Sequence, residues 1–164
     1  MTILVGNCIC LIGNVVYMVS GLGKGKQQIL MLQALFLMCM CLGYGFLGAW
    51  VAVIGDIIGI GTRLLAYKGK LNIWFKILSS ALFIAVSLVF NPITIVNMLP
   101  IISIVAFTFL MDTKDKNRLR IYSMLTLLPW FIYDFHNMAY TNIVINGIAV
   151  VIYTIGIIKT KIMD

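Results

Sequence analysis

Apolar residues run in long stretches along this chain, and polar residues gather in short segments between them. Seven stretches are long enough to cross a bilayer as helices, which takes about 17–25 mostly apolar residues. They lie at about residues 3–21, 28–46, 48–66, 72–90, 94–111, 119–136 and 141–158. The second and third stretches are nearly continuous, and a group of glycines marks the expected turn between them. We therefore predict an all-α membrane protein with seven transmembrane helices.

Composition agrees with a chain that faces lipid. Of the 164 residues, 62% are hydrophobic and 10% are charged, whereas a soluble domain is about 25% charged. A soluble fold of this size could not bury so much apolar surface. The sequence contains no paired carboxylates, P-loop or nucleophile elbow, so we expect no enzyme activity and no cofactor.

Basic residues fall on one side of the seven predicted helices. They lie in or beside the first, third and fifth connections and after the seventh stretch: Lys24, Lys26, Arg63, Lys68, Lys70, Lys76, Lys114, Lys116, Arg118, Arg120, Lys159 and Lys161. Cytoplasmic connections carry the Lys and Arg excess of membrane proteins. The pattern predicts an outside amino terminus and a cytoplasmic carboxyl terminus. Topology explains the net charge of +7, so the expected partner is the lipid bilayer and not nucleic acid.

A shift of 91 residues aligns the third stretch with the seventh, and it brings Lys68 and Lys70 onto Lys159 and Lys161. We interpret this as two parallel three-helix repeats joined by a linker helix. The predicted units are a first repeat at residues 3–68, a linker at 71–91 and a second repeat at 94–161, within one transmembrane domain of residues 1–164. Parallel repeats can face each other across a central site.

Short motifs in the chain resemble a known family. They are Leu99-Pro100-Ile101-Ile102 and Pro129-Trp130-Phe131-Ile132-Tyr133-Asp134, with Leu47-Gly48-Ala49 and Thr62-Arg63 in the first half. Over nearly its whole length the chain is similar to the YgjV family of bacterial inner-membrane proteins, within the SWEET and PQ-loop-like superfamily of seven-helix proteins. The resemblance implies a multi-pass protein of the bacterial plasma membrane. The superfamily implies a small-solute transporter or facilitator that alternates access between two three-helix bundles.

The chain departs from the superfamily pattern in two respects. It has no Pro-Gln pair, and the prolines that SWEET-like proteins place in the first two helices of both repeats occur only in the second, at Pro100 and Pro129. The equivalent positions of the first repeat hold Ile9 and Met38. Because proline removes a helical hydrogen bond and kinks the helix, Pro100 and Pro129 are candidate hinges.

Asp56 is the strongest candidate for substrate binding. It lies near the middle of the third stretch, where an ionisable side chain is costly unless it is paired, solvated or protonated. The alternative is a hydrogen bond between helices that only fixes their packing. SWEET-like proteins hold substrate with polar residues on the third and seventh helices, so the resemblance implies that Asn146 shares this site. Asn14 in the first stretch is a further candidate, with packing between helices as its alternative role.

A second group of candidates lies in the sixth stretch. Trp130 and Asp134 are four residues apart, as are Tyr133 and Asn137, so each pair shares a helix face. An aromatic ring beside an acid suits the binding of a sugar, a ring or an amine. An aromatic belt at the membrane interface explains the same residues equally well.

Four cysteines, Cys8, Cys10, Cys39 and Cys41, lie at matching depths in the first two stretches. This arrangement allows soft-metal binding or a disulfide. However, residues two apart on a helix point about 200° apart, and cysteine also serves as a small apolar filler. We therefore predict no metal site.

Three functions stay open at this point. We expect a small-solute transporter, and the alternatives are a non-transporting receptor or scaffold of the same fold and a vitamin or nucleoside carrier. A carrier needs a polar path between its halves, whereas a scaffold would fill that space with Leu, Ile and Phe. The expected ligand is a small polar solute such as a sugar or a nucleoside, and a homo-oligomer is compatible with the sequence.

Overall fold

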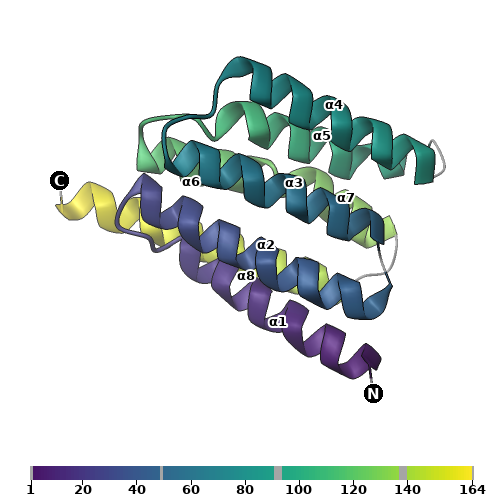
Figure 1. Ribbon diagram of the computed structural model, residues 1–164. Coiled ribbons are helices and arrows are strands. Elements are labelled where there is room, and N and C mark those ends of the chain that lie inside the picture. Colours follow the sequence, from purple (N-terminus) through teal and green to yellow (C-terminus); the bar gives the residue numbers. More distant parts are fainter. Residues whose placement is uncertain (1, 49, 91–93, 137–139, 164) are drawn as a thin grey trace.

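The computed structural model describes residues 2–48, 50–90, 94–136 and 140–163, and every regular element in these ranges is an α-helix (Figure 1). The helices are α1 (Thr2–Ser20), α2 (Lys26–Leu47), α3 (Trp50–Tyr67), α4 (Ile73–Phe90), α5 (Ile95–Leu110), α6 (Lys116–Leu125), α7 (Leu128–His136) and α8 (Tyr140–Met163). Among the described residues, four helices (α1, α2, α4 and α8) are long and apolar enough to cross a membrane, and α5 is a shorter apolar helix. The prediction of an all-α membrane protein is confirmed.

Each predicted stretch coincides with one of these segments to within a few residues, apart from two differences. The sequence predicts one helix at residues 119–136, but the structure has α6 and α7, separated by Thr126 and Leu127. The prediction also places Lys159 and Lys161 after the last helix, whereas α8 continues to Met163 and includes both.

Pro129 accounts for the interruption between α6 and α7. Its ring clashes with the carbonyl group four residues earlier, which belongs to Leu125, the last residue of α6. The Ser103 hydroxyl of α5 donates a hydrogen bond to the carbonyl oxygen of Thr126 at this break. Pro100, in contrast, lies inside the uninterrupted helix α5. Of the two candidate hinges, Pro129 therefore follows a break between two helices, whereas Pro100 lies within a continuous helix.

Helices that are neighbours in the chain also pack on one another. The helix α2 lies between α1 and α3, and α6 and α7 together contact both α5 and α8 (Figure 1). The last helix, α8, also packs against the first helix, α1. On the other side of the bundle, α3 and α5 each pack against α4.

One end of the bundle collects the basic segments, and we call it the basic end. It holds the α1–α2, α3–α4 and α5–α6 connections and the carboxyl end of α8 (Figure 1). Asp112 lies there between two lysines, with its carboxylate oxygens 3.8 Å from Lys26 Nζ and 3.5 Å from Lys76 Nζ.

A buried hydrogen-bond network joins α1 and α2 to α6 and α8. The hydroxyl groups of Tyr153 and Ser20 are 2.6 Å apart. Gln33 Nε2 donates to the Tyr153 hydroxyl at 3.0 Å and to the Ser123 hydroxyl at 3.1 Å. All four residues are buried. Because lipid offers no competing partners, such bonds fix the relative placement of the four helices.

Arg120 makes a second connection on the same side. It is 2% exposed, and it donates from Nε to the Gly21 carbonyl at 2.9 Å, from Nη2 to the Gly23 carbonyl at 2.6 Å and from Nη1 to the Thr160 hydroxyl at 2.9 Å. The sequence pattern treats Arg120 as one of the charges that border a connection. The structure buries it instead, as a link from α6 to the α1–α2 connection and to α8.

Gly156 allows α8 to approach the α1–α2 connection closely. A Cβ atom at this position would collide with the Gly21 carbonyl oxygen and would lie 3.0 Å from Arg120 Nε. The absence of a side chain therefore keeps the Arg120 hydrogen bonds in place.

We predict that Gly156→Ala lowers the free energy of unfolding by about 1–3 kcal/mol, because the added methyl group overpacks this contact. Thermal unfolding of the purified protein in detergent measures the effect. Gly147→Ala is the matched control on the same helix, since a Cβ atom there meets nothing within 4 Å. Equal stability of the two variants would contradict the prediction.

Candidate functional site

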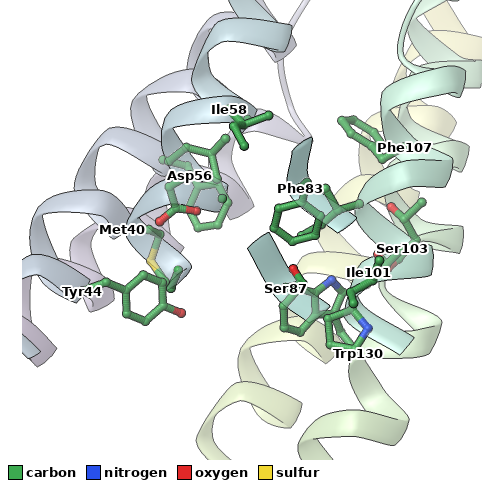
Figure 2. A pocket seen from close by; sticks show the side chains of 18 of the residues that line it. Met40, Tyr44, Asp56, Ile58, Phe83, Ser87, Ile101, Ser103, Phe107 and Trp130 are labelled. Carbon is green, nitrogen blue, oxygen red and sulfur yellow. The ribbon is translucent and has the colours of Figure 1, made fainter. Parts of the chain in front are cut away.

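A cavity of about 810 Å³ opens inside the bundle, between α2 and α3 on one side and α4, α5 and α7 on the other (Figure 2). Sites for small molecules commonly measure about 300–1,000 Å³. Figure 2 shows Asp56 and Tyr44 on one wall, with Ser87, Ser103 and Trp130 on the opposite wall. The cavity is thus large enough for a small organic molecule and has polar groups on both walls.

The cavity is closed toward the basic end. A buried cluster of apolar side chains fills the bundle between the cavity and that end: Ile29, Leu30, Ala66, Leu71, Phe107, Met111 and Leu119. The guanidinium carbon of Arg63 on α3 lies 5.0 Å from the ring centre of Phe107 on α5. This cation–π contact joins α3 to α5 across the closed end.

Four buried polar atoms in the described part of the chain have no hydrogen-bond partner, and all four belong to residues that line the cavity. They are Gln33 Oε1, Asp56 Oδ2, Arg63 Nε and Ser80 Oγ. Leaving a buried polar group unpaired costs about 1–3 kcal/mol, and more when it is charged. Most buried polar atoms in proteins are paired. These four atoms have almost no accessible surface, so an occupant of the cavity would reach them only after their side chains rotate. Polar side chains on both walls suit a polar occupant.

Asp56 and Arg63 lie seven residues apart on α3, so they share one helix face. Arg63 Nη1 donates to the Gly59 carbonyl at 3.2 Å, which turns the guanidinium group back along α3 toward Asp56. No ion pair within 4 Å joins the two charged groups in the described structure. The sequence pattern places Arg63 among the charges around the third connection. The structure agrees with a position near that end of α3 and adds that the Arg63 side chain lines the cavity.

A family model described as bacterial inner membrane protein, Imp-YgjV, matches residues 4–164. The chain belongs to the Imp-YgjV family. No curated protein and no solved structure matches it. The predicted resemblance to this family and the location in the bacterial inner membrane are confirmed, and the placement in the SWEET and PQ-loop-like superfamily stays a prediction.

The cavity of this Imp-YgjV protein brings together most of the residues predicted from sequence. These are Asn14, Asp56, Pro100, Trp130, Tyr133 and Asn146. Trp130 and Tyr133 contact each other edge to face, with ring centres 5.8 Å apart. Pro129 is not among the lining residues. The side chain of Asp134 and the whole of Asn137 lie outside the described residues, so the two pairs predicted on the sixth stretch stay predictions.

Sequence reasoning missed many polar residues of the cavity wall, among them three that have an unpartnered buried atom: Gln33, Arg63 and Ser80. A signal existed for two of them. Gln33 is a rare amide inside an apolar helix, and Arg63 shares a helix face with Asp56 at a spacing of seven residues. Ser80 had no such signal, because serine is common in membrane helices and commonly bonds to its own backbone.

The four cysteines of this Imp-YgjV protein are free thiols. In the described ranges, no group of three or more His, Cys, Asp or Glu side chains could hold a metal ion. Cys10 and Cys39 lie where α1 and α2 meet, against Gly43 and Gly13 of the facing helix. These two cysteines act there as small packing residues.

We predict that Asp56→Asn raises the free energy of unfolding of the empty protein by about 1–3 kcal/mol, because it removes the charge from a carboxylate whose buried Oδ2 atom lacks a hydrogen-bond partner. Thermal unfolding in detergent, without added solute, measures this change. Asp112→Asn is the control, since that residue has two ion pairs at the basic end and its loss should cost up to about 1 kcal/mol. A clear loss of stability in Asp56→Asn would mean that Asp56 only holds helices together.

Proposed function

We propose that this Imp-YgjV protein is a small-solute transporter or facilitator and that the cavity is its binding site. The observation that carries the proposal is the placement of all four unpartnered buried polar atoms, within the described residues, on the wall of one cavity. A scaffold needs neither the empty volume nor the unpaired groups, and both reduce stability. A binding site needs the empty volume, and rotation of these side chains toward the solute would supply the missing contacts.

The arrangement of helices supports a repeat of the type three, one and three. The shift of 91 residues carries α1, α2 and α3 onto residues 93–111, 117–138 and 141–158, where α5, the α6–α7 segment and α8 lie. In each set the middle helix packs against the two others. We propose that residues 3–68 and 94–161 are the two units and that α4, within residues 71–91, is the linker.

The contacts between the two proposed units differ on the two sides of the bundle. The Tyr153 network and the Arg120 hydrogen bonds join α1 and α2 to α6 and α8, so this side is the natural pivot. On the other side the cavity lies between α3 and α5, and the Arg63–Phe107 contact closes its basic end. Alternating access would then require the release of this contact, with Pro100 and Pro129 as candidate hinges in the second unit.

The basic end supports an orientation with this end in the cytoplasm, because Lys and Arg are retained on that side of the membrane. The cavity, closed at the basic end, would then face the outside of the cell in this state. The amino terminus would lie outside and the carboxyl terminus inside.

We expect Thr94→Cys to be labelled from outside and Lys114→Cys from inside. Both positions are exposed, and they lie at opposite ends of α5. The measurement uses intact cells, a membrane-impermeant maleimide and a background in which the four native cysteines are alanine. The cysteine-free parent controls for unspecific reaction. Reversed or equal labelling would contradict the proposed orientation.

The aromatic pair Trp130 and Tyr133 favours one narrower alternative, a vitamin or nucleoside carrier. Trp130 projects into the cavity (Figure 2), and its edge-to-face partner holds the ring in a defined position. A planar ring in a solute could stack on it. A non-transporting receptor or scaffold is the other alternative, and only a flux measurement separates it from a carrier.

We predict that the protein reconstituted in proteoliposomes carries at least one solute from a labelled panel of a hexose, a nucleoside and an amino acid. Ser80→Leu should reduce the flux of that solute toward the rate of protein-free liposomes, because the larger side chain fills the cavity. Ala81→Leu is the control, since Ala81 is the exposed neighbour of Ser80 on α4 and is not a lining residue. No flux of any solute, with or without a pH gradient, would favour the scaffold.

A further inference from the structure

We infer that the solute is a zwitterion of the amino-acid type, with its ammonium group on Asp56, its carboxylate on Arg63 and an apolar or aromatic side chain. This inference rests on the proposed function and specifies the class of solute. It comes from the charges, the spacing and the opposite wall of the cavity.

The charges of the cavity wall call for a ligand with both signs. Among the described residues that line the cavity, Asp56 and Arg63 alone have charged side chains. Asp56 Oδ2 and Arg63 Nε are both buried and unpartnered. A cation would pair with Asp56 only, an anion with Arg63 only, and a neutral sugar would bring a hydrogen-bonded counter-charge to neither group. A zwitterion pairs both charged groups with no net change in charge.

The spacing of the two groups suits a compact zwitterion. Seven residues of helix correspond to about 10.5 Å between the Cα atoms. The Arg63 side chain shortens this span, because its guanidinium group bends back to the Gly59 carbonyl. An ammonium and a carboxylate on one carbon form a compact pair of opposite charges, which suits two protein charges brought closer than their Cα spacing.

The opposite wall is apolar and aromatic. Phe83 of α4, Ile101 of α5 and Trp130 of α7 face the Asp56 side of the cavity (Figure 2). A side chain that leaves the zwitterionic head would meet these residues. Burial of an apolar side chain on them favours larger amino acids over glycine.

The test compares each amino acid with its two singly charged analogues. The probes are phenylalanine, phenethylamine and 3-phenylpropionate, and leucine, 3-methylbutylamine and 4-methylpentanoate. Binding to purified protein is followed by tryptophan fluorescence in a Trp74→Phe background. Trp74 is 74% exposed, and the two other tryptophans, Trp50 and Trp130, line the cavity.

We expect at least one of the two amino acids to bind about ten- to a hundredfold more tightly than both of its analogues, because each analogue leaves one buried charge unpaired. Asp56→Asn should remove the preference over the carboxylate analogue but keep the preference over the amine. Arg63→Gln should do the opposite. A merely structural role of these residues would weaken all three probes of a set alike.

The inference is overturned if neither amino acid binds more tightly than its analogues, or if the two variants do not change the preferences in opposite directions. If one variant fails to fold, the comparison of each amino acid with its analogues in the wild-type protein and in the other variant still tests the inference. Flux of a hexose or nucleoside without any preference for zwitterions would reject the inference and keep the proposed transporter. Zwitterion binding without flux would keep the inference about the site and reject transport.

Discussion

Pairing of buried polar groups is the constraint on which this structure depends, because lipid supplies no hydrogen bonds to a group that the protein leaves unpaired. The bundle meets this constraint on one side and leaves it unmet on the other. On the side of α1, α2, α6 and α8, Tyr153, Ser20 and Arg120 are bonded across helices. At the cavity, Asp56 and Arg63 each keep an unpartnered atom. The first arrangement stabilises the fold, and the second costs stability at the place where a solute could restore it.

The two arrangements divide the bundle into a tightly joined side and a hollow side. Gly156 shows how close the joined side is, since even a methyl group would collide with the Gly21 carbonyl oxygen. On the hollow side, α3 and α5 approach through the Arg63–Phe107 contact and through their shared neighbour α4. A cation–π contact is weaker than a set of buried hydrogen bonds to a charged group. Any relative motion of the two proposed units should therefore open the bundle between α3 and α5.

Gln33 shows that the two sides are not independent. Its amide nitrogen belongs to the joined side, where it donates to Tyr153 and Ser123. Its carbonyl oxygen is unpartnered and belongs to a residue of the cavity wall. Gln33 thus belongs both to the hydrogen bonds that hold α2 to α6 and α8 and to the wall of the cavity.

The sequence by itself determined the helical class, the membrane location and most helix bounds, because runs of apolar residues have one stable solution in lipid. It also singled out Asp56, which lines the cavity, because an acidic residue inside an apolar helix is unusual. Arg63 and Arg120 show what the sequence alone could not predict. Both were counted with the charges of the connections, yet one lines the cavity and the other is buried in a complete set of hydrogen bonds. Only the tertiary structure decided this, because a basic residue near a helix end can turn to water or to a facing helix, and the facing helix comes from a distant part of the chain.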